Sequence, residues 1–179
     1  KFFYDNPLES MGEHERQRWF GCACCPGNVT RFMASVSNYV YATQGNDIYV
    51  NLYIQGKSKM KTADNQVQLV QTTGYPWEGK VSIQVKPEKE SEFAIRLRIP
   101  GWLQSTPVAS DLYAYTTPAE KYTLKVNGST VKPAEGDGYA TIVRTWKPDD
   151  VIELELPMEV RRVKANDQVE DDRGMLAME

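Results

Sequence analysis

The sequence predicts a mainly β chain, an antiparallel β-sandwich preceded by a short helical segment. Two observations support this fold class. From Asp47 onward, short runs in which apolar and polar residues alternate are separated by turn residues, as in half-buried strands. Before that point, apolar residues recur at helical spacing. Regular short strands with turns between them favour two antiparallel sheets packed face to face.

The helix is expected to run from about residue 26 to residue 41. Pro26 suits the first position of a helix, where the N–H group that proline lacks would have no partner. Polar residues separate the apolar ones, so the helix would have one apolar face. The residues of that face are Val29, Phe32, Met33, Val36 and Val40.

Seven strands are expected after the helix. They cover residues 48–54, 66–72, 79–85, 93–99, 122–126, 138–144 and 151–156. The dipeptide Asn127-Gly128 is the strongest short hairpin signal, and Thr130-Val131 would return along the preceding strand. Residues 103–120 are the least patterned stretch and are expected to form a long loop. About a hundred residues are enough for such a sandwich to bury a core.

Length and composition limit the architecture and the partners. The 179 residues form one or two domains at most, and their start without a methionine suggests a piece of a longer protein. We expect a loop and helix in residues 1–44, the sandwich in 45–165 and the start of a further β segment in 166–179. The net charge is −3 with no basic stripe, which disfavours nucleic acid as a partner. No apolar run is long enough to cross a membrane.

All three cysteines, Cys22, Cys24 and Cys25, lie within four consecutive positions. A disulfide framework needs cysteines spread along the chain, and a ring between adjacent residues would be strained. At a helix N-terminus, the positive end of the dipole and the unpaired N–H groups stabilise a thiolate. Because a thiolate is both a nucleophile and a metal ligand, the cluster predicts sulfur chemistry. The alternative is a buried and inert cluster.

As a zinc site, the cluster is only half complete. A structural zinc ion takes four ligands, of which Cys24 and Cys25 could supply two. His14 is the only histidine, so the other ligands must come from elsewhere, and this stretch alone is expected to bind zinc weakly or not at all. The neighbouring acidic residues carry no catalytic motif, and we expect them to be solvated, as charged residues mostly are. They are Glu9, Glu13 and Glu15.

The cysteine cluster lies in a string that resembles the signature of glycoside hydrolase family 127, the β-L-arabinofuranosidases and their relatives. The string is Arg18-Trp19-Phe20-Gly21-Cys22-Ala23-Cys24-Cys25-Pro26-Gly27-Asn28, followed by Arg31. Further stretches resemble the same family, so the resemblance spans nearly the whole chain. They are residues 3–10, 49–53, 97–102 and 156–161.

The resemblance implies a zinc-dependent retaining glycosidase. In the family, three cysteines and a glutamate hold the zinc ion; Cys24 matches the nucleophile and a ligand, Cys25 matches a second ligand, and Cys22 matches neither. The remaining ligands, in a Glu-x-Cys pattern, and the acid/base glutamate lie upstream and are absent from this chain. Residues 1–44 would end an (α/α)6 barrel, whose missing part would be a partner beside the carbohydrate substrate. This stretch alone is therefore expected to be inactive.

Two other classes of function remain open. The chain could be a non-catalytic carbohydrate-binding or scaffold sandwich, although such a module has no use for adjacent cysteines at a helix start. Alternatively, Cys24 and Cys25 could hold a purely structural zinc ion, and neither would attack a substrate. Several aromatic residues could form a sugar platform, but packing in the core or in turns is the more common use of large aromatics. They are Trp77, Trp102, Tyr113, Tyr115 and Trp146.

Overall fold

The computed structural model describes residues 11–15, 18–19, 21–22, 24–103 and 106–179. It divides the chain into two compact units, Lys1–Tyr39 and Val40–Glu179. The first unit contains helix α1 (Cys24–Ser35) and the short 3-10 helix η1 (Val36–Tyr39). No helix in the described part of the chain is long and apolar enough to cross a membrane.

Helix α1 begins two residues earlier and ends six residues earlier than residues 26–41, the range expected from the sequence. Pro26 is the third residue of α1 and still fits, because the first four N–H groups of a helix need no partner within it. At the other end, the Ser35 hydroxyl donates to the carbonyl oxygens of Arg31 (3.3 Å) and Phe32 (3.0 Å). The chain then tightens into η1, and Tyr41 starts a strand because its backbone pairs with Val50.

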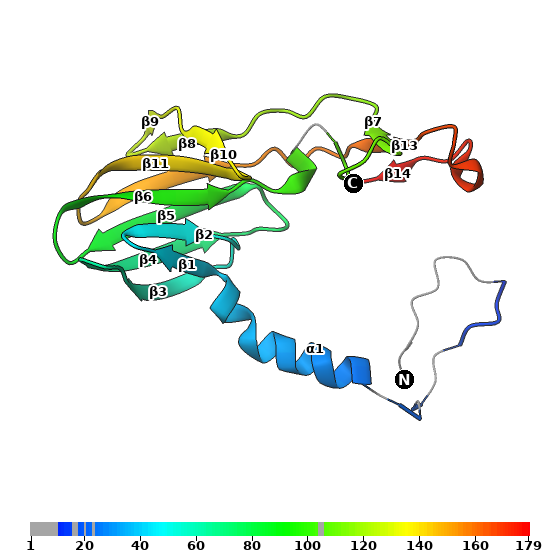
Figure 1. Cartoon of the computed structure of the whole chain (residues 1–179), viewed down its shortest axis with the longest axis horizontal. Helices are drawn as coiled ribbons and strands as arrows, with labels where there is room; N and C mark the ends of the chain where they lie inside the picture. Colours follow the sequence, from blue (N-terminus) through cyan, green and yellow to red (C-terminus); the bar gives the residue numbers. More distant parts are fainter. Residues whose placement is uncertain (1–10, 16–17, 20, 23, 104–105) are drawn as a thin grey trace. The chain divides into compact units, whose positions relative to one another are not determined.

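The second unit is a sandwich of two sheets, with a third small sheet beyond one of its ends (Figure 1). One sheet has the order β1 (Tyr41–Gln44), β2 (Asp47–Val50), β6 (Ser91–Arg98), β11 (Tyr139–Trp146) and β10 (Ala134–Gly136). The other has the order β3 (Gly56–Lys61), β4 (Gln66–Thr73), β5 (Lys80–Pro87), β12 (Asp150–Glu155), β8 (Thr123–Val126) and β9 (Ser129–Thr130). The small sheet has the order β14 (Ala177–Met178), β13 (Arg162–Ala165) and β7 (Tyr113–Tyr115). Two further 3-10 helices are η2 (Gly101–Leu103) and η3 (Glu170–Asp172).

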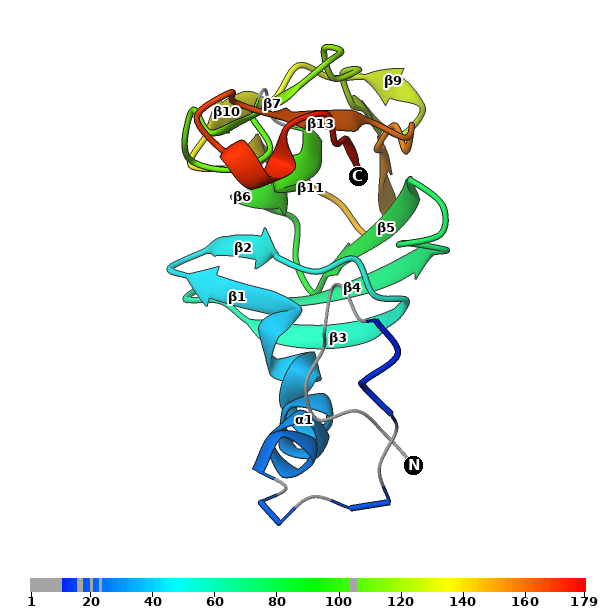
Figure 2. The ribbon, with the colours of Figure 1, turned by 90° about the vertical axis from the view of Figure 1, so that its right-hand side faces the viewer.

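The predicted fold class is confirmed, and the alternating residues are the ones that fill the core. Apolar residues from both sheets meet in one buried cluster, and Figure 2 shows β1 and β2 lying against β3 and β4. The fully enclosed members of this core include Ile48, Val50, Val67, Leu69, Ile83, Val85, Ile95, Leu97, Trp146 and Ile152. The predicted hairpin is also present. Asn127 and Gly128 have φ angles of 51° and 77°, the left-handed conformation that a tight two-residue turn requires.

Several strand predictions were wrong. The strand expected over 48–54 ends at Val50, and residues 103–120 contain β7 rather than only a loop. Strand β3 was missed because it is a sheet edge with three lysines and only Met60 buried, so it lacks the apolar alternation of a covered strand. The sandwich is also not purely antiparallel, since β2 and β6 run parallel. They can do so because the chain crosses to the other sheet between them.

Gly79, the residue just before β5, lies against the backbone of the residue that follows β12. The N–H of Leu156 donates to its carbonyl oxygen (2.9 Å), and a Cβ atom at this position would lie 1.7 Å from the carbonyl oxygen of Leu156. Backbone must therefore move to admit any side chain. We expect Gly79→Ala to destabilise the chain by at least the ~1–3 kcal/mol typical of an overpacked core, measured by urea unfolding.

The matched control is Gly136→Ala in β10, where an added Cβ atom would meet nothing within 4 Å. This variant should unfold within about 0.5 kcal/mol of the original chain, as most surface substitutions do. Equal stability of the two glycine variants would contradict the close approach of the strands at Gly79.

Candidate functional site

The first turn of α1 carries the two adjacent cysteines. Cys24 and Cys25 are the first two residues of the helix, and their Sγ atoms lie 3.9 Å apart. Both side chains and that of Cys22 are exposed, and none of the three forms a disulfide. The structure thus places the thiols at the N-terminal end of the helix, as the sequence predicted, and not in an apolar interior.

Side chains of the second turn hold the carbonyl groups of the first. The amide nitrogen Nδ2 of Asn28 donates to the carbonyl oxygen of Cys24 (3.0 Å), and the hydroxyl of Thr30 donates to the carbonyl oxygen of Pro26 (2.8 Å). Such local bonds restrict the conformations open to a short helix end. The helix itself therefore fixes the backbone from which the two thiols project.

The separation of the two thiols fits one edge of a tetrahedral zinc site. Two sulfur ligands at ~2.3 Å from a tetrahedral zinc ion lie about 3.8 Å apart, and the observed distance between the Sγ atoms is 3.9 Å. Within the described residues, no group of three or more His, Cys, Asp or Glu side chains could hold a metal ion. Glu13, His14 and Glu15 are exposed, and Glu9 lies outside the described residues.

The apolar face predicted for the helix is present but uncovered. None of the twelve residues of α1 is buried, and Val29, Phe32 and Met33 are 60%, 53% and 62% exposed. The apolar stripe of a helix normally packs against another element of the protein. A helix that stood alone in water would have no use for such a stripe. Val40, by contrast, is buried in the second unit, where its carbonyl oxygen accepts from the N–H of Asn51 (2.9 Å).

The aromatic residues considered as a sugar platform do not form one surface. Trp146 is fully buried, and its Nε1–H donates to the carbonyl oxygen of Phe93 (3.0 Å), so it is a core residue. Trp77 is 89% exposed in the turn between β4 and β5. Trp102 packs against the edge of the core. Packing, which is the more common use of large aromatic residues, is therefore the observed role of Trp146 and Trp102.

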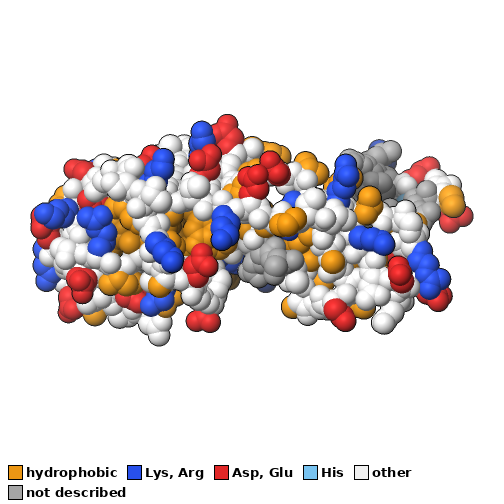
Figure 3. Space-filling view, turned by 90° about the horizontal axis from the view of Figure 1, so that it is seen from above, with side chains coloured by type: hydrophobic (Ala, Val, Ile, Leu, Met, Phe, Trp, Pro, Cys, Tyr) orange, Lys and Arg blue, Asp and Glu red, His pale blue; other side chains and the backbone are white. Residues whose placement is uncertain are grey.

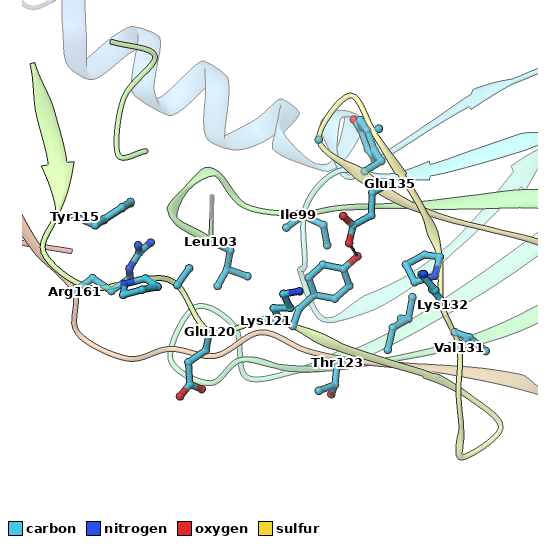
Figure 4. A pocket seen from close by; sticks show the side chains of 18 of the residues that line it. Ile99, Leu103, Tyr115, Glu120, Lys121, Thr123, Val131, Lys132, Glu135 and Arg161 are labelled. Atoms are coloured by element: carbon cyan, nitrogen blue, oxygen red, sulfur yellow. Dashed lines mark hydrogen bonds between the residues drawn. The ribbon is translucent and has the colours of Figure 1, made fainter. Parts of the chain in front are cut away.

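The sandwich unit contains a large cleft that the sequence analysis did not predict. Its volume is about 1100 Å³. Its walls come from the connection that follows β6, the connection from β7 to β8, the β8–β9 hairpin, β10, the start of β11 and Arg161. In Figure 4, Tyr115 and Arg161 lie at one end of the cleft, Val131 and Lys132 lie at the other, and Ile99 lies between.

Two tyrosine–glutamate contacts border this cleft. The Tyr122 hydroxyl donates to Oε1 of Glu135 (2.7 Å), a bond drawn in Figure 4, and the Tyr115 hydroxyl donates to Glu179. Burial, strengthened by the bond to Glu179, raises the pKa of Tyr115 to about 12. Burial and the contact with Glu135 likewise raise the pKa of Tyr122. Both phenols therefore stay protonated and act as donors at neutral pH.

Arg161 holds one end of the cleft in place. It is 7% exposed, and its guanidinium donates to the carbonyl oxygens of Trp102 and Thr117. The same group lies 3.2 Å from the centroid of the Tyr115 ring. Sequence reasoning missed this cleft because Tyr122, Glu135 and Arg161 are far apart along the chain and share no motif.

Comparison with known proteins follows the same division of the chain. The family model described as "Beta-L-arabinofuranosidase, GH127 catalytic domain" matches residues 1–38, and the one described as "GH127 middle domain" matches residues 47–158. The cysteine pair and α1 thus lie in a stretch similar to part of a glycosidase catalytic domain, and the sandwich is similar to the domain that follows it. The chain belongs to glycoside hydrolase family 127.

Individual relatives agree with this membership. The chain is 34% identical over 182 residues to the non-reducing end β-L-arabinofuranosidase of Bifidobacterium longum subsp. longum, covering 97% of this chain and 24% of that protein. A solved GH127 β-arabinofuranosidase is 45% identical with a TM-score of 0.91, covering 99% of this chain and 28% of that one. A GH127 β-L-arabinofuranosidase from Geobacillus stearothermophilus T6 is 35% identical with a TM-score of 0.85, covering 100% and 28%. The chain spans about a quarter of the length of these relatives.

Proposed function

We propose that the intact protein is a retaining glycoside hydrolase that acts on β-L-arabinofuranosides or related plant glycans, with Cys24 as its nucleophile. The observation that carries this proposal is the pair of exposed thiols at the start of α1, with Sγ atoms 3.9 Å apart, in the stretch matched by the catalytic-domain model. The relatives named as β-L-arabinofuranosidases support the substrate class.

The reaction needs two displacements at one carbon atom. The Sγ thiolate of Cys24 attacks the anomeric carbon, a C–S bond forms, and the C–O bond to the leaving group breaks while an acid outside this chain protonates the leaving oxygen. Water then attacks the same carbon, the conjugate base of that acid takes the proton of the water, the C–S bond breaks and the thiolate leaves. Two inversions retain the configuration at this carbon atom. The thiolate thus has the role that a carboxylate has as the nucleophile of ordinary retaining glycosidases.

Cys24 and Cys25 would hold a zinc ion together with ligands supplied by the rest of the polypeptide. A bound zinc ion would keep its coordinating thiols deprotonated at neutral pH. The two thiols would then differ in their roles. Cys25 would only bind the metal, whereas Cys24 would bind the metal and also attack the substrate. The bond from Asn28 to the backbone of Cys24 keeps the reacting residue oriented within the first turn.

Covalent trapping tests the assignment of the nucleophile. The intact protein is incubated with an arabinofuranose-derived electrophile of the bromoacetamide or cyclophellitol type, digested and mapped by mass spectrometry. The adduct is expected on Cys24, because only the attacking thiolate reaches the anomeric position. Cys22 is the internal control, as it is an exposed thiol in the same peptide region.

An adduct on Cys25 or Cys22 with Cys24 unmodified would contradict this assignment. A protein that retains zinc, hydrolyses nothing and forms no adduct would instead support the structural zinc alternative, in which both thiols are ligands and neither attacks.

A further inference from the structure

The cleft of the sandwich unit has a shape and a lining that suit a chain-like ligand. Its volume of about 1100 Å³ slightly exceeds the ~300–1,000 Å³ of typical pockets for drug-sized molecules. The labelled side chains extend from Arg161 at one end to Lys132 at the other (Figure 4). Such a cleft has room for several linked units of a small monomer and not only for one.

The floor of the cleft offers apolar and aromatic surface. Ile99, Leu103 and Val131 pack against the edge of the core and also line the cleft. The half-buried rings of Tyr122 and Tyr139 line it as well. Aromatic rings present large, rigid apolar faces next to a polar hydroxyl, which matches the alternation of C–H faces and hydroxyl groups on a sugar ring.

Glu135 supplies acceptors for hydroxyl groups. Its side chain is exposed, and its carboxylate accepts one hydrogen bond from Tyr122 (2.7 Å). An ionised carboxylate has about four lone-pair sites, so neighbouring hydroxyl groups of one ligand can donate to the remaining sites. Tyr122 fixes the orientation of this carboxylate beside the aromatic floor.

The charges along the cleft nearly cancel. Two lysines, Lys121 and Lys132, and two acidic residues, Glu120 and Glu135, are among the lining residues. The fifth charged group is the guanidinium of Arg161, which donates to two carbonyl oxygens and lies over the ring of Tyr115. In keeping with this, side chains of both signs are interspersed over the described residues of the face in Figure 3. This balance does not favour a phosphorylated or otherwise strongly anionic ligand.

We propose that this cleft binds a neutral oligosaccharide, with Tyr122 packing against a sugar ring and Glu135 accepting from its hydroxyl groups. Only the choice of an oligosaccharide as the ligand rests on the proposed function, because a glycosidase acts on oligosaccharides. Binding at the cleft requires neither Cys24 nor the zinc ion.

Isothermal titration calorimetry of the 179-residue chain and of the intact protein with linear arabino-oligosaccharides tests the proposal. Saturable binding is expected, and Tyr122→Ala and Glu135→Gln should each weaken it at least about tenfold, the usual scale for losing a hydrogen bond to a charged group. The matched controls are Tyr113→Ala and Glu155→Gln, which replace residues of the same types outside the cleft. They should leave the affinity unchanged. Glu135 is exposed, so Glu135→Gln remains informative even where Tyr122→Ala fails to fold.

Three results would overturn the proposal. These are absence of binding, binding that the Tyr122 and Glu135 variants do not change, and tighter binding of an acidic oligogalacturonate than of the neutral chain. Binding by the 179-residue chain that disappears in the intact protein would also overturn it, because the rest of the polypeptide would then occupy the cleft. In the intact protein, Cys24→Ser should abolish turnover and leave the effects of the Tyr122 and Glu135 variants in place. Failure of the nucleophile assignment is thereby separated from failure of the cleft.

Discussion

Replacing Cys24 by serine in the intact protein is expected to reduce turnover of an aryl β-L-arabinofuranoside by about 10⁴-fold or more, the scale seen when a covalent nucleophile is removed. A serine hydroxyl is almost entirely protonated at neutral pH, and a protonated hydroxyl is a much weaker nucleophile than a thiolate. The initial rate of aryl release at saturating substrate measures the effect.

Two further variants separate the nucleophile from the metal ligand. Cys22→Ser should retain turnover, because this thiol has no assigned role. Cys25→Ser should lower both activity and zinc content, the latter measured by metal analysis after dialysis. If Cys24→Ser retained most of the activity while Cys25→Ser lost it, the roles assigned to the two thiols would be wrong.

Replacing Trp146 by alanine should cost about 3–5 kcal/mol of unfolding free energy, as is typical of large buried aromatics. Trp146 is fully buried in β11, its Nε1–H donates to the carbonyl oxygen of Phe93, and the centroids of the two rings lie 6.1 Å apart. Truncation would leave a cavity and an unpaired carbonyl group between the sheets. Urea unfolding of the 179-residue chain measures the change.

The control is Trp77→Ala, which removes a side chain of the same size and chemistry from an exposed position. Trp77 is 89% exposed, so its removal takes little packing away and should change stability by no more than about 0.5 kcal/mol. Trp146→Phe should fall between the two, because it keeps most of the apolar volume and loses the hydrogen bond. Similar losses for Trp146→Ala and Trp77→Ala would show that Trp146 does not hold the core together.

The sandwich was predictable because local patterns determine which side of a strand is buried. Val81, Ile83 and Val85 alternate with polar residues in the sequence, and all three are buried in β5. The turn at Asn127-Gly128 was equally local, since only residues that tolerate a positive φ fit it. The cysteine pair at the helix start was recognisable for a similar reason, as both thiols lie within one turn. The division of the intact protein into domains stays a prediction.

The sequence by itself therefore determined the mainly β class, most strands of the sandwich and the place of the thiol pair at a helix start. Only the tertiary structure decided the parallel pairing of β2 with β6, the insertion of β7 beside β13 and the cleft around Tyr122 and Glu135. The physical reason is that these features depend on contacts between segments distant along the chain. A periodic pattern reports which face of a strand is covered, but it does not specify which other segment covers it.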